Sequence, residues 1–268
     1  MKTATLFTGI RLTSFPSKLL ACPLLLLTLT AHAEKITIAA AADLKFAMDD
    51  IAGAFRDAHP SDEIELIYGS SGKFHTQIQQ GAPYDLYFSA DIAFPRELLE
   101  AGLAASDVRP YALGRIVLWS ASLDASRMTL ASLTDTKITR VAIANPKHAP
   151  YGKRAEEALR ASGLWEQIEP KLVYGENIAH TAQFVQTGNA QVGIIALSLA
   201  LSPELARLGG YWLIPDDLHE PLEQGFIVTK RAQGNALAMR YADYMTSPVA
   251  RAVMTRFGFV LPGEAVGQ

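Results

Sequence analysis

The residues best placed to do chemistry are small and polar, and they form the loop Tyr68–Gly72, with the sequence YGSSG. The loop follows an apolar run at 64–67, which predicts a buried strand, and precedes Lys73–Ile78, which predicts the first turns of a helix. A strand that enters a helix in this way leaves backbone N–H groups free at the positive end of the helix dipole. Because the loop holds no lysine or arginine, it predicts an anion site built from neutral donors. The same pattern is also typical of a simple helix cap.

Three more segments share the order of strand end, small or polar residues and helix start. They are Ala42–Asp43, Pro150–Gly152 and Glu176–Ile178. In open α/β sheets, ligands bind beyond the carboxyl ends of the strands. Four helix N-termini that meet at one cleft would therefore surround a small anion with N–H groups, and the hydroxyls of Ser71 and Tyr151 would add two donors. Each segment alone is equally typical of a structural role, such as a cap at Asp43.

The elements that must position these loops alternate between strand and helix. The predicted strands are 36–40, 64–67, 86–89, 114–120, 141–144, 193–196 and 225–229, and the clearest predicted helices begin near residues 44, 73, 95 and 235. This alternation predicts an α/β fold with largely parallel sheets. Asp43 is the expected N-cap of the first helix, and Gly102 is expected to follow the end of the helix that begins at Pro95. No flexible linker divides the chain, so two lobes would be joined by strands, for which 115–120 and 226–229 are the candidates.

The first 33 residues have the pattern of a secretory signal peptide. Three basic residues precede an apolar run at 19–30, and Ala31-His32-Ala33 fits a cleavage site after Ala33. The segment around Cys22 resembles a lipoprotein cleavage box, but most of the apolar run follows this cysteine, so we favour a soluble product over lipid anchoring at Cys22. Since Cys22 is the only cysteine, the mature chain has no disulfide and no thiol chemistry.

Charge and motifs exclude several function classes. Removal of the three basic residues of the leader takes the formal net charge from −3 to −6, which disfavours binding to nucleic acid or anionic membranes. No Gly-x-Ser-x-Gly, Walker or dinucleotide-binding pattern occurs, and the histidines lack metal-ligand spacing. We therefore expect no enzyme. A structural or sensory ectodomain is a further alternative, which the absence of an apolar helix after Phe259 does not favour.

A set of segments that runs almost end to end through the mature chain resembles the periplasmic molybdate-binding proteins (ModA) of ABC importers. The matching segments are Ala40–Ala47, Gly69–Gly72, Gln80–Leu86, Phe88–Asp91, Gly114–Ser120, Asn145–Gly152 and Phe257–Phe259. Their order and spacing make the set far more specific than any one of them.

This resemblance implies a two-lobed periplasmic-binding-protein fold of type II, in which each lobe is a mixed, mainly parallel sheet flanked by helices and two crossing strands join the lobes. The implied divisions are a signal peptide at 1–33, a first lobe at 34–115 and 226–268, and a second lobe at 116–225. The ligand would lie between the lobes. The binding positions that the family implies are Ala42, Asp43, Ser71, Tyr151 and Ile178, the last through its backbone N–H.

The resemblance also implies the ligand and the partners. We expect molybdate, and tungstate as well, bound as an oxyanion through these residues without any direct bond from protein to metal. Other tetrahedral oxyanions, such as sulfate or a phosphonate, stay open as alternatives. The expected partner is an ABC permease of the inner membrane. We expect a periplasmic monomer with no cofactor and no nucleic-acid partner.

One departure from the family concerns Ala42 and Asp43, where many relatives carry serine or threonine. A carboxylate about 4 Å from a dianion would cost several kcal/mol at intermediate effective dielectric. We therefore predict that the Asp43 side chain turns away and caps the helix that begins at Leu44, while its N–H faces the ligand.

Overall fold

The fold lies in the unit that extends from residue 33 to residue 268, and the computed structural model describes residues 1–6, 9 and 34–264 of the chain. The predicted cleavage site after Ala33 and the alternative at Cys22 fall outside the described residues. Within the described ranges, no helix has the length and apolar character needed to cross a membrane.

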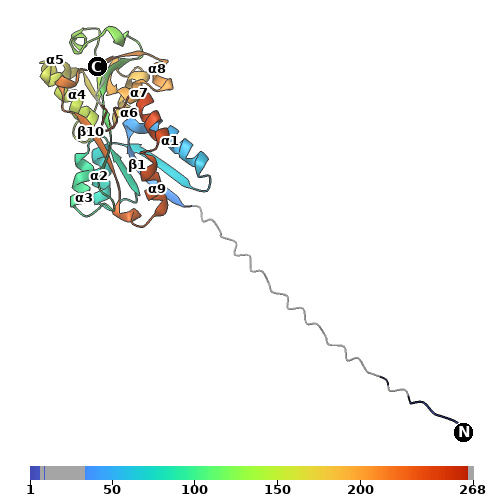
Figure 1. The fold of residues 1–268 in the computed structure, drawn as a ribbon. Coiled ribbons are helices and arrows are strands. Elements are labelled where there is room, and N and C mark those ends of the chain that lie inside the picture. Colours follow the sequence, from blue (N-terminus) through green and yellow to red (C-terminus); the bar gives the residue numbers. More distant parts are fainter. Residues whose placement is uncertain (7–8, 10–33, 265–268) are drawn as a thin grey trace. The chain divides into compact units, whose positions relative to one another are not determined.

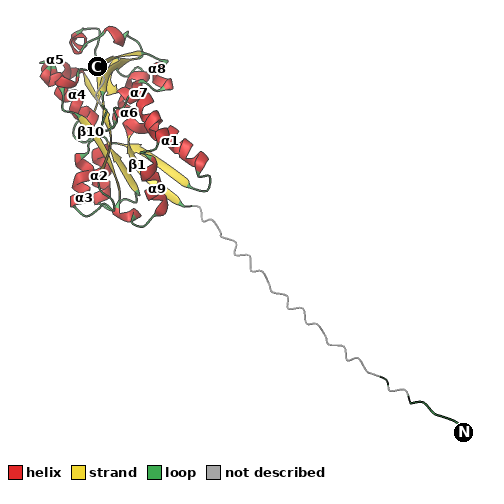
Figure 2. Cartoon of the chain, viewed as in Figure 1, coloured by secondary structure: helices red, strands yellow, loops and turns green. Residues whose placement is uncertain are grey.

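The unit alternates strands and helices along its length (Figures 1 and 2). The strands are β1 (Lys35–Ala41), β2 (Glu63–Gly69), β3 (Leu86–Ser89), β4 (Arg109–Gly114), β5 (Ile116–Ser120), β6 (Val141–Ala144), β7 (Leu172–Gly175), β8 (Val192–Ala196), β9 (Gly210–Leu213) and β10 (Leu222–Val228). The α-helices are α1 (Lys45–Ala58), α2 (Ser71–Gln79), α3 (Ala93–Glu100), α4 (Pro150–Ala161), α5 (Trp165–Ile168), α6 (Ile178–Gln186), α7 (Leu197–Ala200), α8 (Pro203–Ala206), α9 (Ala236–Tyr244) and α10 (Pro248–Arg256). A 3-10 turn, η1 (Ala42–Leu44), connects β1 to α1.

Two five-stranded sheets define the two lobes. The first sheet has the order β2-β1-β3-β10-β4, and the second has the order β7-β6-β8-β5-β9. In each sheet, one strand runs against the other four: β10 is antiparallel to both β3 and β4, and β5 is antiparallel to both β8 and β9. The predicted α/β class and the mixed, mainly parallel sheets are therefore confirmed.

Strand β1 of the first sheet is largely apolar on both faces because helices cover both. Ile36, Ile38 and Ala40 of β1 belong to the core cluster that also contains residues of α1, α9 and α10. The alternate residue Ala39 belongs to a second cluster, with Phe74 of α2 and Leu98 of α3. Since side chains alternate across a strand, this division explains why 36–40 is apolar at every position except Thr37.

The predicted strand at 114–120 differs from the structure. The chain leaves the first sheet at the end of β4, and β5 begins the second sheet after Arg115. The return strand β10 begins at Leu222, opposite Gly114, and all seven of its residues belong to the first sheet. The segment 226–229 is therefore no crossing strand, because its residues 226–228 pair with β3 inside one lobe.

Candidate functional site

The five residues predicted to bind the ligand line one small cavity between the two lobes. Ala42 and Asp43 come from η1, Ser71 from the start of α2, Tyr151 from the first turn of α4 and Ile178 from the first residue of α6. The four segments that share the strand-to-helix pattern thus meet at one place. Their helix starts supply backbone N–H groups that have no partner inside their own helices.

Ser71 is held so that its hydroxyl proton is available to a ligand. The backbone N–H of Ala90 donates to Ser71 Oγ over 3.0 Å, and Tyr87 Oη donates to the Ser71 carbonyl over 2.8 Å. Both bonds are buried, and both use Ser71 as an acceptor. The hydroxyl proton of Ser71, which is 1% exposed, can therefore point into the cavity as a donor.

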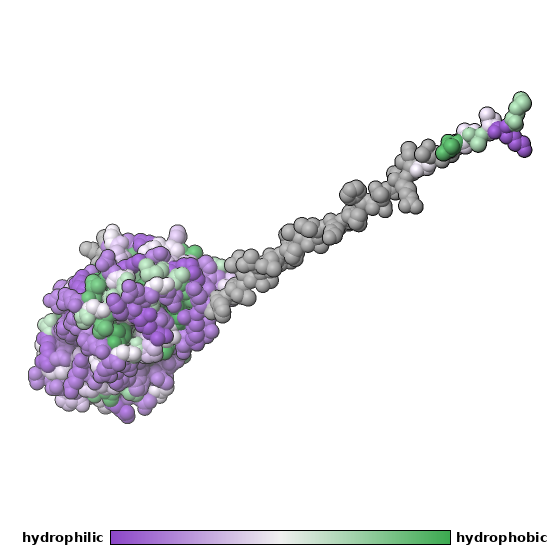
Figure 3. Space-filling view, turned by 90° about the horizontal axis from the view of Figure 1, so that it is seen from below, coloured by the Kyte–Doolittle hydropathy of each residue, from purple (hydrophilic) through white to green (hydrophobic). Residues whose placement is uncertain are grey.

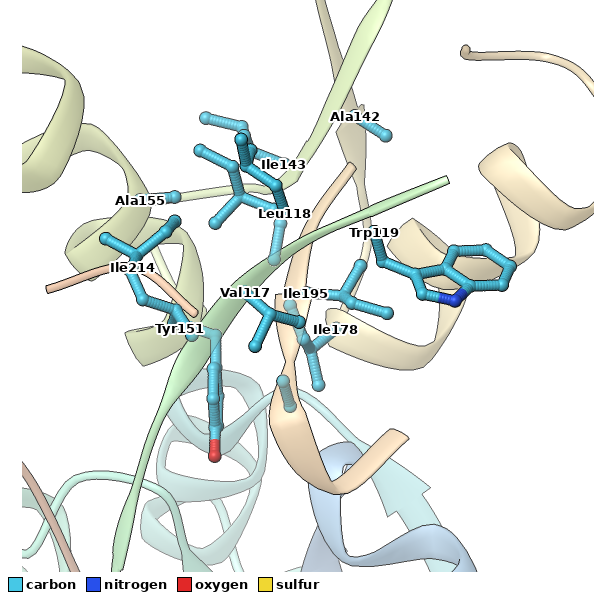
Figure 4. Packing of buried hydrophobic residues seen from close by; sticks show 14 of the residues in the cluster. Val117, Leu118, Trp119, Ala142, Ile143, Tyr151, Ala155, Ile178, Ile195 and Ile214 are labelled. Carbon is cyan, nitrogen blue, oxygen red and sulfur yellow. The ribbon is translucent and has the colours of Figure 1, made fainter. Parts of the chain in front are cut away.

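The second lobe contributes Ile178 and Tyr151. Asn177 caps α6 by accepting the His180 N–H through its side chain at 2.9 Å, which fixes the first turn where Ile178 lies. Figure 4 shows the Tyr151 ring at the edge of the apolar cluster that contains Val117 and Ile195, with its hydroxyl pointing away from that cluster. The apolar part of Tyr151 thus anchors it in its own lobe, while its hydroxyl reaches the other one.

The Tyr151 hydroxyl belongs to a buried polar cluster, which we call the Asp43 cluster: Asp43, Tyr151 and Gln224. Tyr151 Oη donates to Asp43 Oδ2 over 3.0 Å. Gln224 Nε2 donates both to Asp43 Oδ2, over 2.9 Å, and to Tyr151 Oη, over 3.0 Å. The hydroxyl of Ser198 donates to the Asp43 carbonyl over 2.8 Å. The cluster therefore joins η1 and β10 of the first lobe to α4 of the second.

The predicted capping role of Asp43 is wrong. Neither η1 nor α1 has a side-chain cap, and the residue at the N-cap of α1 is Leu44. The Asp43 carboxylate instead accepts hydrogen bonds from Tyr151 and Gln224 and lies in the wall of the cavity. The physical reason is that two buried donors from distant segments converge on Oδ2.

Burial dominates the electrostatics of the Asp43 cluster. Desolvation raises the pKa of Asp43 from 3.8 to about 6, although the hydrogen bonds from Gln224 and Tyr151 act to lower it. Burial, followed by the nearby Asp43 charge, raises the pKa of Tyr151 well above its ordinary value. Tyr151 is therefore neutral at physiological pH, and Asp43 is the group in this cluster whose charge can change.

A glycine makes the close contact between the lobes possible. A Cβ at Gly114, the last residue of β4, would overlap Tyr151 Oη and Gln224 Nε2. Any other residue here would push apart two members of the Asp43 cluster. The glycine is thus required by the approach of α4 to the first sheet.

A second set of contacts joins the lobes beside Ser71. The Gly72 N–H donates to the His148 carbonyl over 2.9 Å, and Ser70 Oγ donates to the same carbonyl over 2.5 Å. The ammonium of Lys73 forms an ion pair with Glu176 across the gap, and this contact lowers the pKa of Glu176. Ser70 and Gly72 therefore hold the lobes together, while Ser71 between them faces the cavity.

A larger cleft of about 390 Å³ adjoins the cavity and shares Ala42 and Asn177 with it. Lys45 and Phe46 of α1 and His180 and Gln183 of α6 line this cleft, so both lobes contribute to it. Figure 3 shows one face of the molecule, on which hydrophilic residues predominate. Among the described residues, no group of three or more His, Cys, Asp or Glu side chains could hold a metal ion.

Sequence reasoning missed Gln224 and Ser198. Gln224 is fully buried in β10, and a glutamine directly before an apolar run was a signal that its amide needs buried partners. Ser198 follows β8 at the start of α7, which is a further strand-to-helix junction. The sequence did not indicate a site here because apolar residues surround Ser198, whereas the predicted segments are small or polar.

Comparison with known proteins identifies the family. The family model described as a bacterial extracellular solute-binding protein matches residues 36–260. The molybdate-binding protein ModA of Rhodobacter capsulatus is 37% identical over 237 residues, which cover 87% of this chain and 91% of the relative. ModA of Azotobacter vinelandii is 36% identical, over 88% of this chain and 94% of the relative.

Solved structures agree with this assignment. The periplasmic molybdate-binding protein of Azotobacter vinelandii superimposes with a TM-score of 0.80 at 29% identity and covers 85% of this chain and 99% of that one. A sulfate-binding protein of Mycobacterium tuberculosis, at 15% identity and a TM-score of 0.71, shares the fold alone. With a family model that spans most of the chain and relatives above 35% identity over almost their full length, the chain belongs to the ModA family of bacterial extracellular solute-binding proteins.

Proposed function

We propose that this protein is the molybdate-binding component of an ABC importer, and that it binds tungstate as well. The observation that carries the proposal is the convergence of Ala42, Asp43, Ser71, Tyr151 and Ile178 on one cavity between the lobes. Ser71 contributes a hydroxyl donor, and Ile178 contributes the free N–H at the start of α6. The ModA relatives support the choice of ligand.

The chemistry of the donors suits a fully deprotonated tetrahedral dianion. Such an anion accepts hydrogen bonds at every oxygen, and each charge-assisted bond contributes about 1.5–3 kcal/mol. The donors come from both lobes, so a bound dianion stabilises the arrangement in which the lobes are in contact. The function proposed is binding and transfer, without catalysis and without a cofactor.

The proposal places the mature protein in the periplasm, after export through the leader at 1–33. There it would act as a monomer that delivers its anion to a permease in the inner membrane. The Lys73–Glu176 ion pair and the Gly72–His148 hydrogen bond connect the lobes at the surface. They give a permease a means to distinguish joined lobes from separated ones.

One observation favours a second candidate, an oxyanion that carries a proton, such as hydrogen phosphate or a phosphonate. Asp43 places an acceptor in the cavity wall, and a protonated oxyanion could donate to it. A dianion without a proton has no group to offer Asp43. The two candidate ligands therefore differ in protonation: molybdate and tungstate carry no proton, whereas hydrogen phosphate or a phosphonate carries one that can be donated to Asp43.

Thermal unfolding with a panel of anions tests both candidates. Molybdate, tungstate, sulfate and phosphate are added separately at matched ionic strength. A ligand at about 1,000 times its Kd stabilises the folded state by about 4 kcal/mol. We expect a clear rise in Tm with molybdate and tungstate only. A rise with phosphate alone would support the protonated oxyanion, and equal rises with all four would contradict any specificity.

A further inference from the structure

Two buried oxygen atoms of the Asp43 cluster are without a partner among the described residues. They are Asp43 Oδ1 and Gln224 Oε1. Both are acceptors, and their side chains are already joined at the other end, where Gln224 Nε2 donates to Asp43 Oδ2 over 2.9 Å. Asp43 is 1% exposed and Gln224 is 0% exposed, so bulk water does not supply the missing donors. Buried acceptors are rarely left unpaired, because each loses the hydrogen bond that water gave it.

A carboxylic acid and a primary amide form a cyclic pair with two hydrogen bonds. The amide N–H donates to one carboxyl oxygen, and the carboxyl O–H donates to the amide oxygen. The first of these bonds exists between Gln224 and Asp43. A single proton on Asp43 Oδ1 would supply the second and would give both unpaired oxygens a partner.

The ligand gives a separate reason for the same proton. Asp43 lies in the wall of the cavity with Ser71 and Ile178, where the proposed function places a dianion. A neutral carboxyl group removes the repulsion between two like charges in a buried site. Burial already raises the pKa of Asp43 to about 6 without any anion.

No cation in the described surroundings compensates the charge of Asp43 directly. The side chains that interact with its carboxyl are Gln224 from β10 and Tyr151 from α4, and the backbone N–H groups of Asp43 and Leu44 interact with it more weakly. The Asp43 charge also acts on Tyr111 from β4, and the pKa of Tyr111 and of Tyr151 is raised well above the ordinary value. The elements packed against η1 are α1, β2, α6 and α7. Their nearby ionisable groups are Lys45, Tyr68 and His180, which line the adjoining cleft, and α7 faces Asp43 with the neutral Ser198.

Protonation also changes what Tyr151 can do. With Asp43 ionised, the Tyr151 hydroxyl donates its proton to Oδ2. When Asp43 is neutral, its oxygen is a weaker acceptor, so the tyrosine proton is free to turn toward an anion oxygen. One proton taken up from solvent would thus remove a charge and release a donor.

We propose that Asp43 takes up one proton when the site binds its oxyanion, and that it shares this proton with the side-chain oxygen of Gln224. The proposal rests on the proposed function, since it concerns the same site. It makes Asp43 and Gln224 positioning residues for the Tyr151 hydroxyl. Anion binding should then weaken as the pH rises.

Isothermal titration with molybdate between pH 6.5 and 8.5 measures this linkage. Titrations in two buffers of different ionisation enthalpy give the number of protons taken up. The wild type should take up close to one proton above pH 7, and its affinity should fall about tenfold per pH unit. Asp43→Asn should take up none and bind with an affinity that does not depend on pH, because its amide N–H replaces the acid proton toward Gln224.

A matched control is Asp85→Asn, which removes a buried carboxylate of the first lobe that pairs with Arg231 outside the cavity. This variant should keep the pH dependence of the wild type. Any contribution from His148 or His180 is present in all three proteins, so the difference between wild type and Asp43→Asn isolates Asp43.

Infrared spectroscopy gives a second readout that is independent of heat. The wild type with molybdate at pH 7.5 should show the carbonyl band of a protonated carboxyl group, which is absent from Asp43→Asn. Gln224→Leu should shift this band to higher frequency, because the amide hydrogen bonds are lost. Tight binding without proton uptake and without the band would overturn the proposal and leave the proposed function intact. No binding of molybdate or tungstate at any pH would overturn both.

Discussion

The two walls of the cavity present opposite hydrogen-bonding groups: one offers a donor and the other offers acceptors. On the side of α2 and β3, Ser71 accepts the Ala90 N–H and the Tyr87 hydroxyl, so its own proton remains to be donated. On the side of η1 and β10, Asp43 and Gln224 each present a side-chain oxygen that has no hydrogen-bond partner among the residues that the structure describes. The first wall is ready for an anion as it stands, and the second needs a proton. A site can therefore be complete in shape and still incomplete in hydrogen bonding.

The largest expected difference between the two walls concerns the free energy of unfolding and its dependence on Asp43. The folded-state pKa of Asp43, about 6, is above its ordinary value of 3.8, so the folded protein holds this proton more tightly than the unfolded chain. The resulting stabilisation is complete below pH 4 and is lost as the pH rises through 6. At pH 7 the loss amounts to about 3 kcal/mol. Asp43→Asn should therefore raise the free energy of unfolding by up to about this amount.

Urea unfolding at pH 4, 5.5 and 7 measures this effect. The advantage of Asp43→Asn should shrink toward zero at pH 4. Asp85→Asn should instead destabilise the protein at pH 7, since Asp85 accepts the Thr37 N–H at 2.8 Å and pairs with Arg231. A loss of stability in Asp43→Asn at pH 7 would mean that the ionised cluster holds the lobes together.

The donor wall should show its effect in affinity. Ser71→Ala removes one charge-assisted hydrogen bond to the anion, worth about 1.5–3 kcal/mol, which corresponds to an increase of about 10- to 150-fold in the Kd for molybdate. The pH dependence of binding should stay that of the wild type, because Asp43 is unchanged. Calorimetric titration at pH 7 and pH 8 measures both quantities.

Ser71→Ala also leaves the Ala90 N–H without its acceptor, so part of its effect is structural. Ser106→Ala is the matched control, because Ser106 Oγ accepts the Val228 N–H at 3.0 Å away from the cavity. It should lower stability with no change in Kd. Equal Kd values for the two variants would remove Ser71 from the ligand site.

The donor wall was predictable from the sequence because its signals are local. The strand, the YGSSG loop and the start of α2 lie next to each other in the chain, and helix starts have known donors. The same holds for Tyr151 and Ile178, which begin α4 and α6. The predicted strand at 86–89 coincides with β3, and the predicted strand at 36–40 lies within β1, because both are buried on two faces.

The second wall was not predictable in the same way. Asp43 and Gln224 are 181 positions apart, and they meet only because β10 inserts between β3 and β4. A carboxylate directly before a helix is most often a cap, and no local feature shows that distant donors compete for it. Strands β4, β7 and β9 are not among the predicted strands, and at least half of the residues in each of them are only partly buried or exposed.

The smallest expected effect tests whether contacts outside the two walls matter. The Lys73–Glu176 ion pair joins the lobes at the surface, and both side chains are about half exposed. Exposed pairs contribute little, so Lys73→Met should raise the Kd for molybdate less than about fivefold at low salt. The change should vanish at high ionic strength, where such pairs are screened.

Lys35→Met is the matched control, because the ion pair of Lys35 with Glu63 lies within the first sheet and does not join the lobes. This variant should leave the Kd unchanged at every salt concentration. If Lys73→Met weakened binding as much as Ser71→Ala, the surface ion pair would contribute as much to molybdate binding as the Ser71 hydroxyl does. The contrast between a donor wall and a proton-dependent wall would then account for little of the affinity.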